Sequence, residues 1–327
     1  MKTGRSPSTT RPVGLFCGLA VVDVIQLVQA PPGPDDKIVA LDQLIAAGGP
    51  ATNAAVAFAA LGGRATLAAP VGAGPLAELV RADLAGTGVE LLDCSDCSDC
   101  SDRSGGSDGA GPAPGLSVSS CTITAGTGRR SVVSTNARAA VDTAPLDRYA
   151  ARAACGQEAP PDVVLIDGHN PALARAALDL AARAGALTVM DAGSWKDPAA
   201  DLPARCDVVA ASARFYPPGP AGPVTAPQDV ARHLLDAGAR GVVVTRGERP
   251  ALWWTAGARG SVQPPQVEAA DTLGAGDVFH GALAHALAGA RRDQLTGPVL
   301  SAAVTSACAV AAASTTAFGT RAWLRQT

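Results

Sequence analysis

The second half of the chain alternates short, continuous apolar runs with Ala-rich segments of helical length. The runs that predict buried strands are 162–167, 187–191, 207–211 and 241–245, followed by two further strands near 251–255 and 261–268. The segments that predict helices are 171–184, 227–237, 277–289 and 297–313. Buried strands joined through helices form a mainly parallel sheet with helices on both faces. We therefore predict an α/β fold, a three-layer α/β/α sandwich around a mainly parallel central sheet.

The first half of the chain adds strands of a different kind. Residues 15–23 predict a buried first strand, and Gly48-Gly49-Pro50 opens a helix over 51–61 with proline at its start. Residues 24–47 and 116–136 mix or alternate polar and apolar side chains, as half-exposed strands do. Such strands do not fit the central sheet. We expect them to form a small β-sheet lid near the carboxyl ends of the central strands, where ligands bind in such folds.

Length and charge limit the class of protein. The chain has 327 residues, 47% of them hydrophobic, and a net charge of −3. We expect one large domain over 13–327, no nucleic-acid partner, no membrane span and a cytoplasmic location. Residues 1–12 predict a disordered basic tail. Together with the apolar run after them they also resemble a signal peptide, but Asp23 interrupts that run and a buried strand is favoured.

A low-complexity segment lies within the first half of the chain. Residues 93–115 are rich in Ser, Asp, Gly and Pro and predict a disordered insertion. Within it, Cys94, Cys97 and Cys100 have the spacing of a metal or iron–sulfur site. They lie in a perfect Cys-Ser-Asp repeat without a fourth ligand nearby, which favours a tolerated repeat. We therefore predict no metal site there.

The heptapeptide Asp271-Thr272-Leu273-Gly274-Ala275-Gly276-Asp277 joins a flexible turn to the start of an apolar helix. The free N–H groups and the positive dipole end of a helix N-terminus attract anions. Glycines allow the backbone to close around a phosphate. A carboxylate beside such a site would repel the ligand unless it had a role, and the natural role for Asp277 is that of a general base.

Two stretches together resemble one family. Residues 48–55, Gly-Gly-Pro-Ala-Thr-Asn-Ala-Ala, are similar to the N-terminal motif of the ribokinase-like (PfkB) carbohydrate kinases, and residues 271–277 are similar to their C-terminal motif. The order of elements agrees over roughly 13–320, apart from the insertion. Within the family, residues 271–277 most resemble ketohexokinase-like members, and the following Val-Phe-His-Gly-Ala-Leu most resembles sulfofructose kinase-like members. The resemblance implies a ribokinase-like fold and transfer of phosphate from ATP, with Mg²⁺, to a sugar hydroxyl.

The resemblance also implies roles for single residues. Asp277 matches the catalytic base, and the amides of Gly274, Ala275 and Gly276 match the anion hole for the transferring phosphoryl group. The implied substrate contacts are Asp23, Gly49, Asn53, Asn136 and His169. The implied nucleotide contacts are Thr245, Gly247, Thr272, Ala307 and Ser314. Lids in this family often pair, so a homodimer through the lid is expected.

The sequence departs from the family at two places. Many members carry Asn-x-x-Glu after the strand near Ala211, with the Glu organising magnesium, whereas this chain has no Glu there. Magnesium would then be held mainly by ATP phosphates and water, as is common for this ion; ketohexokinase-like members share the departure. The arginine matched to a sulfonate is replaced by His169. We therefore do not predict a sulfosugar.

Several alternatives stay open. Arg129 and Arg130 fit either an anionic substrate or a solvated hairpin, and His169 fits either a substrate contact or a structural turn. Asp191 is a candidate to approach phosphate or metal, and His280 is interpreted as packing. For the whole chain, the alternatives are a nucleoside kinase on the same fold and a catalytically weak sugar- or nucleotide-binding protein.

Overall fold

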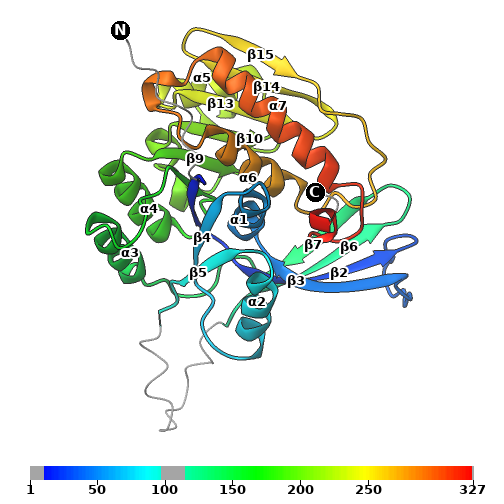
Figure 1. Cartoon of the computed structure of the whole chain (residues 1–327). Coiled ribbons are helices and arrows are strands. Elements are labelled where there is room, and N and C mark those ends of the chain that lie inside the picture. Colours follow the sequence, from blue (N-terminus) through cyan, green and yellow to red (C-terminus); the bar gives the residue numbers. More distant parts are fainter. Residues whose placement is uncertain (1–10, 97–114, 326–327) are drawn as a thin grey trace.

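The central sheet of nine strands lies between two helical layers, with a smaller sheet projecting to one side (Figure 1). The computed structural model describes residues 11–96 and 115–325. The strand order in the central sheet is β15-β14-β13-β10-β9-β8-β1-β4-β5. All strands from β13 to β5 run parallel, and β14 and β15 are antiparallel at one edge. The predicted three-layer α/β/α fold is confirmed.

The bounds of the elements are as follows. The central strands are β1 Val13–Cys17, β4 Arg64–Ala69, β5 Val89–Asp93, β8 Val163–Ile166, β9 Leu187–Ala192, β10 Val208–Ser212, β13 Gly241–Arg246, β14 Arg249–Thr255 and β15 Arg259–Val262. The helices are α1 Pro50–Ala60, α2 Pro75–Ala85, α3 Ala144–Ala154, α4 Pro171–Ala184, α5 Pro227–Asp236, α6 Ala275–Leu287 and α7 Gly297–Ser314. The strands of the small sheet are β2 Val21–Val28, β3 Asp42–Gly48, β6 Val118–Thr124 and β7 Arg129–Ser134, and β11 Pro218–Gly219 pairs with β12 Gly222–Pro223.

Each face of the central sheet has its own apolar core. On one face α1, α2, α6 and α7 cover side chains such as Phe16 and Leu67, and on the other α3, α4 and α5 cover Leu15 and Val164 (Figure 1). Adjacent side chains in β1 therefore enter opposite cores, as expected for a strand buried on both sides. This explains why the central strands are continuous apolar runs in the sequence.

The first predicted strand is in fact two strands. β1 ends at Cys17, and the chain turns through Gly18 into β2, which belongs to the small sheet. A Cβ at Gly18 would lie 2.2 Å from the carboxylate of Asp167, which also accepts a hydrogen bond from the Leu19 N–H at 2.7 Å. Asp23 therefore lies within the small sheet. The prediction that it ends the first strand is wrong.

The small sheet is the predicted lid, with the order β3-β2-β6-β7. On its inner face Ile25, Cys121 and Ile123 pack against Leu273 and Phe318, so the small sheet contacts the C-terminal part of the chain. The strands arise from the two predicted regions, 24–47 and 116–136, although β2 begins earlier and 29–41 contributes no strand.

Other differences concern elements that the sequence interpretation missed or extended. Helix α3 and strand β5 were not predicted, and β15 ends at Val262, well short of the predicted 268. The predicted insertion begins too early: Asp93 closes β5 and Cys94 is fully buried. Cys97 and Cys100 lie outside the described residues, as do 1–10 of the predicted tail.

Helix α7 bears on the expectation that the chain has no membrane span. By length and composition it is the one helix in the described part of the chain that could cross a membrane. Its buried residues, however, belong to the core formed with α6 and the sheet, including Leu300, Val304 and Ala307. This is the arrangement of a core helix, for which an apolar composition is expected.

Candidate active site

The N-terminus of α6 is where the sequence predicts an anion site. Gly274 is the N-cap and adopts φ 72°, a left-handed conformation that favours glycine. The first helical hydrogen bond runs from the Val278 N–H to the Gly274 carbonyl, at 2.9 Å. The amides of Gly276 and Asp277 precede that bond, so they have no carbonyl one helical turn earlier to bind. Gly276 is exposed, which leaves this end of the helix open to an anion.

Asp277 is half-buried and points from the first turn of α6 toward α1. Its Oδ2 accepts a hydrogen bond from Asn53 Nδ2 at 2.8 Å. The pKa of Asp277 is raised to about 7, first by burial and then by the nearby Asp191, against the lowering effects of Asn53, His280 and Arg130. A carboxylate with a pKa near neutrality can exchange a proton with a substrate at physiological pH, which is what a general base requires.

Asn53 and Gly49 are placed by the start of α1. Gly49 is the N-cap of α1 with φ 101°, and a Cβ there would lie 2.3 Å from the Leu19 carbonyl. Asn53 is buried one turn later, and its N–H donates to the Gly49 carbonyl at 2.9 Å. Asp167 accepts from the Ala51 N–H at 3.2 Å as well as from Leu19. This carboxylate therefore fixes the helix start relative to the lid.

Asp23 faces the same region from the lid. It is 5% exposed and pairs across the sheet with Ala46 and Ser119, and the Ser119 hydroxyl hydrogen-bonds to it. Burial raises the pKa of Asp23 to about 6, against the lowering effects of Ser119 and Arg321. Its carboxylate lies over Gly48, where a Cβ would be 1.9 Å away. Room for Asp23 is thus one reason for glycine before α1.

The structure brings Asn136 and His169 together. His169 Nδ1 lies 2.6 Å from Asn136 Oδ1, which joins the end of the lid hairpin to the loop after β8. Burial lowers the pKa of His169, so the neutral ring with a proton on Nδ1 fits this contact. Asn136 is exposed, with φ 61°, and His169 is half-buried. In this structure the two side chains contact each other and not a substrate, so their substrate role stays a prediction.

The predicted nucleotide residues come from three parts of the chain: β13 and the turn after it, the loop before α6, and helix α7. Thr245 and Gly247 lie at the end of β13 and in the turn after it, where Gly247 is exposed. Thr272 donates to the Gly128 carbonyl at 2.7 Å, so it binds the lid hairpin. Ser314, the last residue of α7, donates to the Ala311 carbonyl. Ala307 is 0% exposed within the core. Contact between Ala307 and a nucleotide would require this packing to change, so its nucleotide role stays a prediction.

His280 does more than pack. Its Nδ1 lies 3.0 Å from Asp191 Oδ2, and its Nε2 lies 3.2 Å from the Ala210 carbonyl. Against the lowering effect of burial, the attraction of Asp191 leaves the pKa of His280 raised. Against the raising effect of burial, the attraction of His280 leaves the pKa of Asp191 lowered. We interpret the pair as a buried ion pair beside the base. The predicted approach of Asp191 to a ligand would require that pair to open.

The Asp191–His280 pair also belongs to a group of side chains with suitable atoms for a metal ion. The side chains of Asp191, His280 and Asp277 offer atoms within 4.8 Å of one another. The first two already neutralise each other, so we do not assign an ion to them. The residues after β10, Ala213 and Arg214, provide no carboxylate.

Two arginines at the site carried no sequence signal for these contacts. Arg130 of the lid is exposed and donates to the Thr272 carbonyl at 2.7 Å. Arg321, from the segment after α7, donates to Asn53 Oδ1 at 2.9 Å and to the Ala47 carbonyl at 2.6 Å. Neither position belongs to a local motif, so only the folded chain reveals these contacts.

A match to a protein-family description supports the interpretation of this site. Residues 117–326 match the family described as pfkB family carbohydrate kinase. The chain belongs to this family. The matched region includes the whole anion site, the lid hairpin and the segment that carries Arg321, so the family's C-terminal motif and the base candidate lie inside it.

Solved structures and curated relatives extend the comparison. Ribokinase from Giardia lamblia superposes with a TM-score of 0.74 at 14% identity, covering 96% of each chain. Arabidopsis thaliana ribokinase, complexed with ribose and ATP, gives 0.66 at 16% identity and covers 97% of this chain and 98% of its own. Deoxyribokinase from Salmonella typhi is 47% identical over 55 residues, which is 17% of this chain and 18% of the relative. The structural matches show a ribokinase-like fold.

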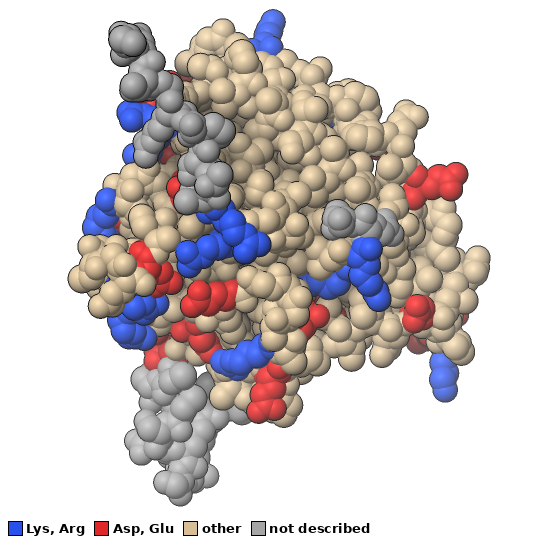
Figure 2. All heavy atoms as spheres, in the orientation of Figure 1, with Lys and Arg blue, Asp and Glu red and all other residues tan. Residues whose placement is uncertain are grey.

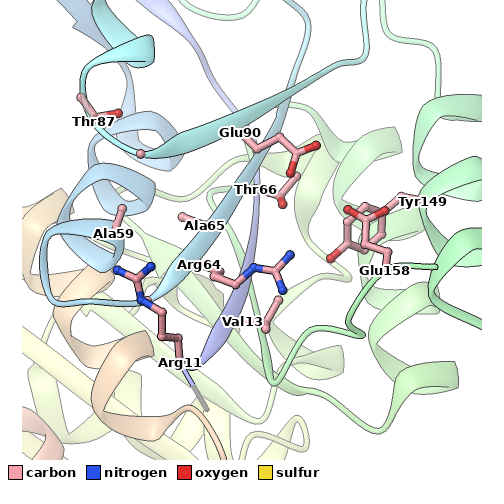
Figure 3. A pocket seen from close by; sticks show the side chains of 12 residues that line it. Arg11, Val13, Ala59, Arg64, Ala65, Thr66, Thr87, Glu90, Tyr149 and Glu158 are labelled. Atoms are coloured by element: carbon pink, nitrogen blue, oxygen red, sulfur yellow. The ribbon is translucent and has the colours of Figure 1, made fainter. Parts of the chain in front are cut away.

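A cavity elsewhere in this pfkB family member is not part of the site. It measures about 270 Å³ and lies at the amino ends of β1 and β4, beside Val13 and Arg64. Figure 3 shows the guanidinium of Arg64 reaching toward Glu158, with Glu90 near it. Opposite charges face each other in this cavity, and it lies away from the carboxyl ends of the strands, where ligands bind in open α/β sheets.

Proposed function

We propose that the protein is an ATP-dependent sugar kinase that transfers the γ-phosphate of ATP to a sugar hydroxyl, with Asp277 as the general base. The observation that carries the proposal is the arrangement at the start of α6: free amides and a carboxylate whose pKa lies near 7 share one helical turn. Membership of the pfkB family supports it.

The residues account for the reaction as follows. Asp277 takes the proton from the sugar hydroxyl as its oxygen bonds to the γ-phosphorus, and the bond from that phosphorus to the ADP oxygen breaks. The amides of Gly274, Ala275 and Gly276, aided by the helix dipole, would stabilise the charge on the transferring group. Magnesium, when held by the ATP phosphates, would supply further charge neutralisation. Asp23, Gly49 and Asn53 would hold the sugar, with Asn136 and His169 at the lid edge.

The charges favour a neutral sugar over a phosphorylated one. Asp23 and Asp277 both face the site, and each would repel an anionic substrate. The two arginines near them donate to protein acceptors: Arg130 to Thr272, and Arg321 to Asn53 and Ala47. We infer a neutral polyol such as a pentose, in line with the ribose-bound neighbour and the deoxyribokinase segment.

The first test is replacement of the base. Asp277→Asn keeps the shape of the side chain and removes the proton acceptor, so we expect kcat to fall by about 10²–10⁴-fold. ADP release is measured with ATP·Mg²⁺ and a panel of pentoses, deoxypentoses, ketohexoses and nucleosides. Asp236→Asn, an exposed change on α5, is the matched control. Near wild-type turnover by Asp277→Asn would refute the mechanism.

The same panel separates the alternatives. Turnover with nucleosides alone would identify a nucleoside kinase, and ligand-induced thermal stabilisation without turnover would identify a binding protein.

We also propose a cytoplasmic location, where ATP is abundant, and a homodimer through the lid. On the face drawn in Figure 2, acidic and basic side chains are interspersed, and the net charge is −3; both accord with the absence of a nucleic-acid partner.

A further inference from the structure

Arg321 connects three parts of the molecule that meet beside the base. It lies in the segment after α7, with its side chain 15% exposed. Its Nη2 donates to the carbonyl of Ala47, at the inner end of lid strand β3, and lies 3.5 Å from Asp83 of α2. Its Nη1 donates to Oδ1 of Asn53, on α1. One guanidinium thus holds the lid root, α2 and α1 in a fixed relation.

The contact with Asn53 determines which way that amide faces. A guanidinium has only donors, so the atom of Asn53 that faces Arg321 at 2.9 Å must be the oxygen. The NH₂ group then faces Asp277 and donates to Oδ2 at 2.8 Å. Without Arg321, rotation of the amide by a half turn would direct its oxygen at Asp277, where only a protonated carboxyl could bind it.

We propose that Arg321 is a positioning residue for the kinase reaction: by binding the carbonyl oxygen of Asn53, it makes that amide donate to Asp277 and so keeps the base charged and aimed. This inference rests on the proposed function for its kinetic consequence. Its structural content, the link from Arg321 through Asn53 to Asp277, stands on the two hydrogen bonds alone. Arg321 itself does not contact the substrate in this arrangement.

The burial of Arg321 is costly, which argues for a specific role. Its Nε is buried without a hydrogen-bond partner, and such a group costs free energy. Burial also lowers the pKa of Arg321, against the opposing effects of Asp83 and Asp23. An apolar side chain of similar length would avoid both penalties and could still fill the space. What it could not do is donate to Asn53.

Other charged groups also act on Asp277, so the test must separate them from Arg321. Those facing it are Asp191 from β9, His280 on α6 itself and Arg130 from β7. Asp271, Asp23 and Asp83 lie around the two arginines. None of these contacts changes when Asn53 rotates, and none binds the oxygen of Asn53. A change that is transmitted through Asn53 is therefore specific to Arg321.

The kinetic experiment compares Arg321→Met with Arg325→Met, an exposed arginine in the same segment. The methionine keeps much of the stem volume and removes the donors. We expect the acidic limb of the kcat–pH profile to move up by about one pH unit, because an Asn53 amide free to rotate no longer holds the hydrogen bond that favours the charged form of Asp277. At pH 6 kcat then falls about tenfold, while at pH 9 it changes less than about twofold. An unchanged acidic limb would overturn the proposal, even if KM or stability changed.

A second experiment needs no catalysis. The titration of Asp277 is followed by ¹³C NMR of aspartate-labelled protein, with the resonance assigned from Asp277→Asn. Wild type, Arg321→Met, Asn53→Leu and the double variant form a double-mutant cycle. If Arg321 acts through Asn53, Arg321→Met shifts the midpoint in the wild-type background and much less in Asn53→Leu. An equal shift in both backgrounds means a direct charge effect and refutes the link. Should wild type phosphorylate no substrate, the proposed function fails while this titration still decides the inference.

Discussion

At the scale of single residues, the site keeps a carboxylate in surroundings that favour its neutral form. Asp277 has its pKa raised to about 7, by burial first and by Asp191 second. Asn53 and His280 oppose this, each by stabilising the charged form. The base is therefore held close to the pH at which it must gain and lose a proton. Such a balance is useful for catalysis, and it has a cost for folding.

That cost gives a prediction for stability. The pKa of Asp277 is 3.8 before burial and about 7 in the folded protein. Because the folded value is the higher one, the stability that Asp277 contributes is complete below about pH 4 and is lost as pH rises through about 7. Asp277→Asn, neutral at every pH, should thus be more stable than wild type at pH 8, by on the order of 3 kcal/mol.

Thermal or urea unfolding at pH 4, 6 and 8 measures this difference. The stability difference between Asp277→Asn and wild type should be small at pH 4 and should grow toward pH 8. Asp236→Asn, the exposed control on α5, should show no such growth. A constant difference across the range would mean that Asp277 titrates at its ordinary value and would contradict the assigned environment.

At the scale of elements, the site depends on the contact between α1 and α6. Asp277 and Gly281 lie four residues apart on one face of α6, and Asn53 and Ala54 are adjacent on α1. A Cβ at Gly281 would lie 2.2 Å from the Ala54 carbonyl. The glycine therefore allows the close approach of the two helices that places Asn53 within 2.8 Å of the base.

Gly281→Ala tests that relation. The added methyl must push α6 away from α1, which should destabilise the protein by about 1–3 kcal/mol and lower Tm by several degrees. We also expect kcat to fall, because the hydrogen bond from Asn53 to Asp277 lengthens. The control is Gly86→Ala, since φ there is −82° and an added Cβ would meet only the Asp83 carbonyl at 4.0 Å. Equal Tm values for Gly281→Ala and wild type would rule out the close contact.

Individual elements also show how far the sequence could lead. Strands β8, β9, β10 and β13 and helices α4–α7 were predicted because buried strands are short apolar runs and the segments between them have helical length. The break between β1 and β2 was missed because both strands are apolar, and only Gly18 marks the turn. Helix α3 was missed although Pro145, Leu146 and Tyr149 are its buried face.

The site divides in the same way. Asp277 and Asn53 are carried by local motifs, so their positions could be predicted from the sequence, and the structure brings them together. Arg321 reaches Asn53 across 268 positions, and His280 meets Asp191 from another element. Contacts of this kind depend on how separate elements pack. The full burial of Ala307 was likewise not predicted, because the buried face of a helix cannot be assigned from an Ala-rich sequence.

At the scale of the whole molecule, the lid leaves an apolar surface uncovered. The side chains of one row across the lid, set by the strand register, share its outer face: Ile45, Val24, Ser120 and Val133. Of these, Ile45 is 44% and Val133 77% exposed. Every residue of the edge strand β7 is exposed as well. An apolar face beside an open strand edge is a surface that a second copy of the chain can cover.

The lid dimer that we propose can be tested by placing a charge in that row. Val133→Asp would bury a carboxylate at the interface, which costs several kcal/mol without a partner, so we expect a dimeric wild type to become monomeric. Molar mass is measured by light scattering after size-exclusion chromatography over a range of concentrations. Val267→Asp, at a residue 42% exposed and outside the lid strands, should leave the mass unchanged. Because Asp23 lies on the opposite face of the same lid, the monomer should also bind sugar more weakly, as a rise in KM. A monomeric wild type, or a Val133→Asp variant that remains dimeric, would show that this face is not the interface.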